Sequence, residues 1–256
     1  MLDNPGHGRE HSGMDMEHIE RIEADGETHT IDLARLSVRA LNQFLHEELP
    51  KGNIKRVEIL HPNGLHNLAV GVDWPVEIDV RGHAGYFIAG MNKRANITVH
   101  GSVGWSVAEN IMSGVVRVRG NASECAAASG HGGLLVIEGN ASSRCGISMK
   151  GCDIVVGGGV GHVSAFMAQA GRLVVCGDAG AGLGDSLYEA VIYVRGKLHG
   201  LGTDAREEEM SDEDRRQVAD LLAQAGISYD AREFKRIASA RTLYHWHSES
   251  SPLAYS

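Results

Sequence analysis

Aliphatic and polar residues alternate along the middle of the chain, and the pattern returns every 19 residues. Each repeat holds two aliphatic residues separated by a single residue, and glycine follows after one further residue. This alternation has the period of a β-strand that buries one face, and the glycine indicates a turn that ends the strand. The two aliphatic columns are Ile78, Ile97, Val116, Leu135, Ile154, Leu173 and Ile192, and Val80, Val99, Val118, Ile137, Val156, Val175 and Val194.

The glycine of the repeat forms a column that continues through seven repeats without a slip. The tetrapeptide GNAS, found at 120–123 and again at 139–142, marks two successive members of this column. Short repeats that bury little alone and stack to share a core are solenoids. We therefore expect a stack of about seven coils, with a looser opening turn over 57–75. The column is Gly82, Gly101, Gly120, Gly139, Gly158, Gly177 and Gly196.

A further column accepts only the smallest side chains. It lies seven residues after the glycine, and only alanine or glycine occupies it. Such a restriction predicts close approach of the backbone inside the stack, where a larger side chain would overpack. The period of 19 differs from the 18 of the left-handed hexapeptide acyltransferase helix, so we expect a mainly β fold, a right-handed parallel β-helix over 57–204. The column is Ala89, Ala108, Ala127, Gly146, Ala165 and Gly184.

The two ends of the chain differ from the repeat. We expect an N-terminal extension over 1–31, a helical flank over 32–56 and a C-terminal helical arm over 205–256. The flank has Asp32 as the expected N-cap and Pro50 as its stop. The arm is expected to hold one helix from Ser211 to Gly226 and a second over 230–247. Helices at both ends would cover the open strand edges of the stack.

Charge and composition limit the possible partners. The 256 residues carry a net charge of −9, which disfavours nucleic acid and anionic membrane surfaces. The sequence has no run of 18 apolar residues and no secretory signal, so we expect a cytoplasmic protein. None of the cysteines forms a C-x-x-C pair, and we expect reduced, packed thiols rather than a zinc or redox site. The cysteines are Cys125, Cys145, Cys152 and Cys176.

Two glycine-rich segments, 157–161 and 180–184, resemble phosphate-binding loops. Neither leads into an apolar-periodic helix and neither contains the Lys-Ser/Thr pair of a P-loop, so we interpret both as solenoid turns. Cys125 with His131 could form a nucleophile and base, but no orienting group accompanies them. We interpret Cys125 as a packed thiol.

Histidines and acidic residues are scattered over the repeat. The histidines of the coils lie mostly in different columns, which does not force three or four metal ligands together. The aspartates occupy unrelated columns, and no carboxylate pair for glycoside hydrolysis is formed. We therefore expect no catalytic, cofactor-binding or metal-binding residue in this chain. The residues in question are His83, His100, His131 and His162, and Asp153, Asp178 and Asp185.

The segment Gly177-x-x-Gly180-x-x-x-Gly184, with degenerate copies beginning at Gly101 and Gly158, resembles the GXGXG motif. That motif belongs to the β-helix domain at the end of the large glutamate synthase chain and to a subunit of formylmethanofuran dehydrogenase. The flanks DLARLSVRALNQFLHEEL and AREFKRIASARTLYHW resemble the free-standing version of the domain, the β subunit of N-methylglutamate synthase.

The resemblance implies a scaffold without catalytic residues in a glutamate synthase-like complex. In that family a class II amidotransferase-like subunit and a synthase subunit with FMN and an iron–sulfur cluster are separate chains. The implied reaction converts methylamine and glutamate to N-methylglutamate and ammonia. Alternatives are a subunit of an ordinary glutamate synthase, a subunit of a formylmethanofuran dehydrogenase-type complex, and a self-sufficient β-helix enzyme that acts on a polysaccharide.

Overall fold

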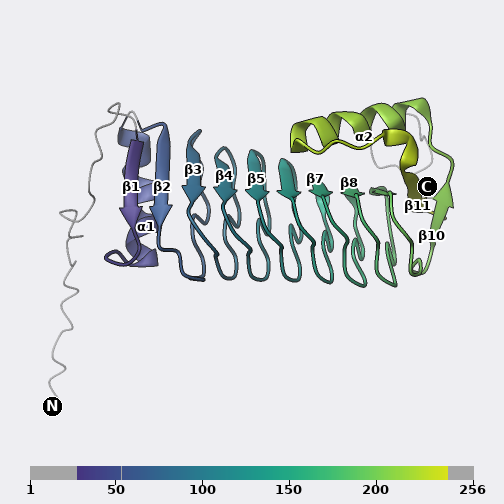
Figure 1. Cartoon of the computed structure of the whole chain (residues 1–256), viewed down its shortest axis with the longest axis horizontal. Coiled ribbons are helices and arrows are strands. Elements are labelled where there is room, and N and C mark those ends of the chain that lie inside the picture. Colours follow the sequence, from purple (N-terminus) through teal and green to yellow (C-terminus); the bar gives the residue numbers. More distant parts are fainter. Residues whose placement is uncertain (1–27, 53, 242–256) are drawn as a thin grey trace, which may run out of the picture.

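The structure, a computed structural model, describes residues 28–52 and 54–241. Its centre is a stack of coils, each of which contributes one strand to a continuous parallel sheet (Figure 1). The strands are β2 (Arg56–Leu60), β3 (Glu77–Val80), β4 (Asn96–Val99), β5 (Val115–Val118), β6 (Leu134–Ile137), β7 (Lys150–Val156), β8 (Ala170–Val175) and β9 (Val191–Val194).

The register of the sheet follows the sequence repeat. Ile78 lies opposite Ile97, and Val80 lies opposite Val99, so each aliphatic column becomes one row of the core. The expected opening turn forms a full strand, β2, whose Val57 pairs with Ile78. A second row of parallel bridges joins the residues two positions after each glycine, from Ala84 to Leu198. The predicted mainly β solenoid is confirmed.

The glycine column lies where successive coils approach most closely. A Cβ built on Gly177 would lie 2.7 Å from the carbonyl carbon of Gly158 and 2.7 Å from the nitrogen of Gly159. The Gly177 N–H donates a hydrogen bond to the Gly158 carbonyl oxygen at 2.8 Å. The same bond links Gly139 to Gly120 at 3.0 Å. Any side chain here would push the coils apart and break this bond.

The column of alanine and glycine has a conformational reason in addition to packing. Ala127 is fully buried and adopts a left-handed backbone, with φ of 52°. Its neighbours Cys125 and Ser129 are also left-handed, so the coil turns through three such residues in alternate positions. This region disfavours bulky side chains. A Cβ on Gly184 would meet Ile192 at 3.1 Å, which shows that the column points into the core.

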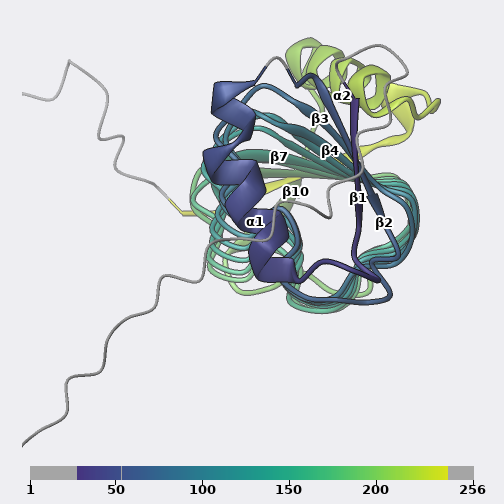
Figure 2. The same ribbon diagram turned by 90° about the vertical axis from the view of Figure 1, so that its left-hand side faces the viewer.

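The N-terminal end is closed by β1 (Thr28–Asp32), α1 (Val38–Glu47) and the short 3-10 helix η2 (Leu49–Lys51). Figure 2, which looks along the stack, shows α1 lying across its end. The predicted helix start at Asp32 is wrong: Asp32 ends a strand paired with β2, and Ser37 caps the helix by accepting a bond from Ala40 N at 3.2 Å. The edge of β2 recruits 28–32 as a strand because it offers unpaired backbone groups.

Side chains of α1 bond to the first coil. Asn42 Nδ2 donates to the Asn67 carbonyl oxygen at 2.7 Å, and its Oδ1 accepts from Val70 N at 3.2 Å. His46 Nε2 lies 2.7 Å from the Val70 carbonyl oxygen. These side chains satisfy backbone groups that have no preceding coil to pair with. The helix is therefore an end cap for the stack.

The C-terminal end contains β10 (Ala205–Glu208), α2 (Asp212–Ala225), the 3-10 helix η3 (Ala231–Glu233) and β11 (Lys235–Ser239). Helix α2 lies where expected, with a capping box between Ser211 and Asp214 and a left-handed Gly226 at its end. The second helix expected over 230–247 is wrong: residues 235–239 form a strand, and 242–247 lie outside the described residues. Strand β11 pairs antiparallel with both β9 and β10, because the open edge of β9 overrides local helix propensity.

Candidate interaction surfaces

The residue after each column glycine forms a hydrogen-bonded ladder along the outside of the stack. Asn121 Oδ1 accepts from Asn140 N at 2.8 Å, and Asn140 Oδ1 accepts from Gly159 N at 2.8 Å. Asp178 Oδ1 accepts from Lys197 N at 2.8 Å in a later coil. The asparagines of the two GNAS segments therefore bond one coil to the next, and their repetition is explained by the stack.

Three of the scattered histidines have bonds to the stack. His83 Nδ1 accepts from Ser102 N at 2.9 Å, His162 Nδ1 lies 3.0 Å from Ser143 Oγ, and His100 Nε2 lies 2.7 Å from Asp79 Oδ1. His131 is exposed on a turn of another coil. The structure brings no two of these four histidines together at a shared hydrogen-bond partner. Within residues 28–52 and 54–241, no three histidine, cysteine, aspartate or glutamate side chains could hold a metal ion.

The cysteines are free thiols with raised pKa values. Burial raises the pKa of Cys145 to about 12, that of Cys152 to about 12 and that of Cys176 to about 11. Burial also raises the pKa of the half-buried Cys125. The charge of Arg144 lowers this pKa, whereas the charges of Glu124 and Glu109 raise it. A thiol is nucleophilic as the thiolate, so these side chains are poor nucleophiles at neutral pH.

The two segments that resemble phosphate loops use their N–H groups within the stack. Gly158 N donates to the Gly139 carbonyl oxygen at 2.8 Å, and Gly180 N donates to the Val160 carbonyl oxygen at 2.9 Å. The N–H of Gly161 donates to the Ala141 carbonyl oxygen at 3.1 Å. Anion binding needs N–H groups that point at the ligand, and these are already bonded to the preceding coil.

The outer face of the sheet changes character along the stack. The residue three positions before each glycine points outward; we name these residues the outer column. It is polar in β3 to β5 and apolar in β6 to β9, and helix α2 covers only the apolar part. Val136, Val155 and Val174 are fully buried under α2 with Leu221 and Leu222. The outer column is Asp79, Thr98, Arg117, Val136, Val155, Val174 and Tyr193.

Arg117 marks the boundary between the covered and the bare part. Its Nη1 donates to the Ala225 carbonyl oxygen at 2.7 Å and its Nη2 to the Gln224 carbonyl oxygen at 3.1 Å, which satisfies the last turn of α2. At the other end of the helix, Tyr193 donates to Asp214 Oδ1 at 2.7 Å. Burial would raise the pKa of Asp214, but bonds from Ser211 and Tyr193 and the charge of Arg236 lower it to about 2.

The part of the outer face that α2 leaves uncovered contains a paired carboxylate, that of Asp79. Asp79 is nearly buried and accepts from Arg56 Nε at 2.9 Å, in addition to its contact with His100. Burial opposes ionisation of Asp79, but the bonds from His100 and Arg56 outweigh it and lower the pKa of this carboxyl. The Asp79 carboxylate and the Arg56 guanidinium therefore form a structural ion pair, in which the two charges compensate each other.

A stack of rings lies along the turns of the first coils. The His66 and Tyr86 rings have centroids 4.2 Å apart and planes 6° apart, and the Tyr86 and Trp105 rings follow at 5.4 Å and 21°. Tyr86 N also donates to His66 Nδ1 at 3.0 Å. The Trp105 side chain is 52% exposed, although rings of this size are usually covered.

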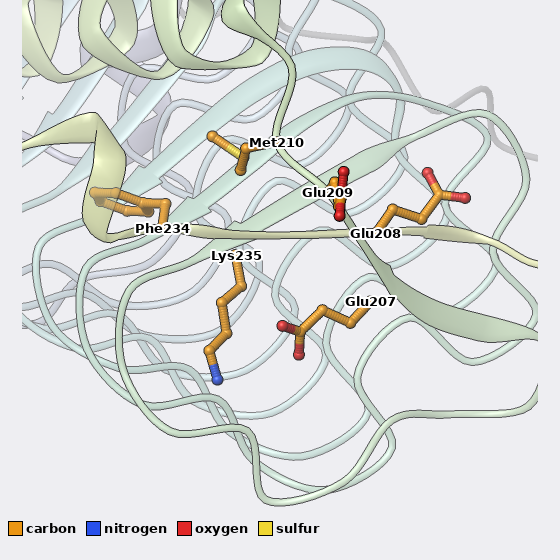
Figure 3. Close-up of a pocket in the computed structure, with 6 residues that line it drawn as sticks. All are labelled: Glu207, Glu208, Glu209, Met210, Phe234 and Lys235. Atoms are coloured by element: carbon orange, nitrogen blue, oxygen red, sulfur yellow. The ribbon is translucent and has the colours of Figure 1, made fainter.

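A pocket of about 490 Å³ lies at the far end of the molecule, beside the paired strands β10 and β11. It is lined by Glu207, Glu208, Glu209, Met210, Phe234 and Lys235. In Figure 3 the charged side chains of the pocket point in different directions and do not converge on one point. Glu208 is also paired with Arg236, so the pocket offers no constellation for catalysis.

Two features of these surfaces were not anticipated from the sequence. The change of the outer column from polar to apolar predicts a covering element over β6 to β9, and this signal is readable once the repeat is aligned. The ring stack is visible as Tyr86 and Trp105, which are 19 residues apart, with His66 one position out of register.

No helix among the described residues has the length and apolar character needed to cross a membrane.

Comparison with known proteins shows a similarity over most of the chain. The chain is 53% identical over 223 residues to protein GlxC of Rhizobium meliloti (strain 1021), a match that spans 86% of this chain and 97% of that protein. No protein-family profile matches the chain. No solved structure matches it.

Proposed function

This chain belongs to the family of protein GlxC, and on that premise we propose that it is a non-catalytic scaffold subunit of a glutamate synthase-like complex. The complex we propose is N-methylglutamate synthase, which converts glutamate and methylamine to N-methylglutamate and ammonia. The scaffold joins a class II amidotransferase-like subunit to a synthase subunit that carries FMN and an iron–sulfur cluster. The match to GlxC extends over nearly all of that protein.

One observation carries the proposal: the polar groups of the coils are used in holding the coils together. The N–H groups of Gly158, Gly161 and Gly180 bond to the preceding coil, and the Asn121 and Asn140 side chains bond to the following one. The buried Cys145 and Cys152 have pKa values raised to about 12. Such a stack is a rigid body with long exposed sides, which suits it to hold other chains in fixed positions.

The coil motif supports the choice of complex. Gly177, Gly180 and Gly184 form the segment that resembles the GXGXG motif, and their backbone contacts explain why glycine occurs there. A Cβ on Gly180 would lie 2.7 Å from the carbonyl carbon of Gly161, while Gly184 has a φ of 68°. The methylamine branch rests on the resemblance of the two flanks, one of which is the α1 cap.

The test is purification of the tagged full-length chain from its native cells, followed by mass spectrometry, an absorbance spectrum and an activity assay. We expect an amidotransferase-like chain and a flavin-containing chain in the eluate, and formation of N-methylglutamate from methylamine and glutamate. Glutamate formation from glutamine and 2-oxoglutarate instead would move the chain to ordinary glutamate synthase. A pterin-containing partner would favour the formylmethanofuran dehydrogenase type, and a colourless eluate without partners would refute the proposal.

A single variant distinguishes a scaffold role of this chain from a catalytic role. Cys125→Ser removes the most exposed thiol of the four described cysteines. We expect the complex with this variant to form in the same amount and to turn over at the wild-type rate. A complex that assembles normally but loses activity would assign a catalytic role to this chain.

A further inference from the structure

Exposed apolar side chains gather on the first coils of the solenoid. Among the described residues, nine large hydrophobic side chains are exposed, and six of them come from residues 65–112. We name these six the aromatic face. Scattered single exposed hydrophobics need no explanation, whereas contiguous ones mark an interaction site. Tyr86 and Trp105 are in ring contact, and Phe87 N donates to the Trp105 carbonyl oxygen, so these three residues are neighbours. The aromatic face consists of Leu65, Tyr86, Phe87, Met91, Trp105 and Met112.

Two rings of this face are already ordered. Tyr86 and Trp105 are stacked on one another, the neighbouring His66 stacks on Tyr86, and the backbone below them is fixed by hydrogen bonds between coils, such as Phe87 N to the Trp105 carbonyl oxygen at 2.9 Å. A partner that binds to fixed rings loses little side-chain entropy. Tyrosine, tryptophan, phenylalanine and methionine are the residues enriched in protein interfaces.

The fold does not require these side chains. In the coil that follows Trp105, Glu124 takes the equivalent position. In the coil that follows Phe87, Ser106 takes the equivalent position. Phe87 has a φ of 58° and is 42% exposed, so a bulky side chain stands in a disfavoured conformation and faces water. The left-handed backbone recurs at the same position of the later coils, in Ser106, Cys125 and Arg144, so the coil imposes it. The exposure of the Phe87 ring does not stabilise the isolated chain.

The charges beside the face are acidic. Glu109 lies beside Met91, because the Met91 N–H donates to the Glu109 carbonyl oxygen at 2.7 Å. Glu124 occupies the position of Trp105 in the next coil. Neither glutamate forms an ion pair within residues 28–52 and 54–241. The nearby cations Lys93 and Arg94 are both paired with Asp73, and Arg144 is the one further cation that lies, like the two glutamates, near Cys125 in the described part of the chain. A partner that brings lysine or arginine to this border would pair the two free carboxylates.

We propose that the aromatic face binds a different polypeptide of the complex, through an apolar segment flanked by lysine or arginine. A second copy of this chain fits less well, because a two-fold interface places the same patch against itself and Lys93 and Arg94 of the second copy are already paired with Asp73. The inference rests on the proposed function for the identity of the complex. The chemistry of the occupant follows from the face itself.

The test replaces Tyr86 with the photo-crosslinker p-benzoylphenylalanine in the tagged full-length chain, expressed in the native cells. Tyr229 is the matched control position, because both tyrosines are 41% exposed and Tyr229 lies outside the coils, in the segment after α2. We expect position 86 to give at least a fivefold higher yield of one crosslinked product than position 229. The product contains a different polypeptide, and its crosslinked peptide contains apolar residues beside lysine or arginine.

A second measurement tests the charge. We expect the double variant Glu109→Lys, Glu124→Lys to lower the yield at position 86 at least fivefold. The variant Glu109→Gln, Glu124→Gln shows an intermediate loss. Both variants keep the wild-type circular dichroism spectrum, because these side chains have no ion pair in the described part of the chain to lose.

Three results would overturn the inference: a crosslink between two copies of this chain, a yield at position 86 no higher than at 229, or a yield that charge reversal leaves unchanged. The identity of the captured chain tests the proposed function separately. A synthase or amidotransferase-like chain supports both. A partner of another enzyme class with the stated peptide chemistry supports the aromatic face and refutes the proposed complex.

Discussion

Replacing Gly177 with alanine tests the stacking of the coils most sharply. The added methyl group would lie 2.7 Å from the Gly158 carbonyl carbon, 2.7 Å from Gly159 N and 2.9 Å from the Gly158 carbonyl oxygen. All three are backbone atoms, which cannot swing aside as the end of a flexible side chain can. The coils must separate locally to admit the methyl group.

The magnitude follows from two costs. Overpacking of this kind costs about 1–3 kcal/mol. Weakening the 2.8 Å bond from Gly177 N to the Gly158 carbonyl oxygen adds roughly 0.5–1.5 kcal/mol. The sum is about 2–4 kcal/mol, which corresponds to a fall in melting temperature of roughly 5–15 °C for a chain of this size.

The control is Gly90→Ala, another glycine of the coils. Its added Cβ would meet nothing closer than the Phe87 carbonyl oxygen at 3.4 Å, an ordinary contact. We expect its stability to change by less than about 1 kcal/mol, in the stabilising direction, because alanine restricts the unfolded chain. Thermal unfolding of both variants by far-UV circular dichroism gives the comparison. Equal melting temperatures for Gly177→Ala and wild type would refute the account of the glycine column.

Three further predictions follow from other parts of the stack. Ala127→Leu should lower the free energy of unfolding by about 1–3 kcal/mol through overpacking. Ala127→Gly should change it by less than about 1 kcal/mol, because glycine accepts the left-handed backbone. Urea unfolding measures both variants, and a reversed order would contradict an internal left-handed column. Asn140→Ala should cost about 1–2 kcal/mol and speed hydrogen exchange at the Gly159 amide; unchanged exchange there would contradict the ladder. The ionised Asp214 carboxylate stabilises the folded chain by about 2 kcal/mol, since its pKa is lowered from 3.8 to about 2. This stabilisation is present above pH 4 and is lost as the pH falls from 4 toward 2, so the stability difference between wild type and Asp214→Asn should shrink over that window in urea titrations; a constant difference would contradict the assignment.

The repeat was predictable because its physical causes leave direct marks in the sequence. The Ile78 and Val80 columns follow from strand alternation, and the Gly82 column follows from close contact between coils. The left-handed φ of Ala127 was not predictable from the residue alone, because alanine is uncommon in that conformation and only the stack imposes it.

The ends of the chain were less predictable because tertiary contacts decide them. Residues 235–239 form strand β11, since the open edge of β9 offers unpaired backbone groups that local propensity does not anticipate. Helix α1 begins at Ser37 rather than at Asp32 for the same reason at the other end. The aromatic face was not predictable, because the aligned repeat gives the spacing of its residues along the chain and does not show which of their side chains are exposed.

The most direct test of the central claim measures N-methylglutamate formation by extracts of native cells that lack this chain, before and after the chain is restored. The account predicts loss of activity without the chain, and full recovery with wild type and with Cys125→Ser. The amidotransferase-like and flavin-containing chains should separate on gel filtration when this chain is absent and elute together when it is present. Full activity without the chain, or two partners that stay together without it, would contradict the scaffold account.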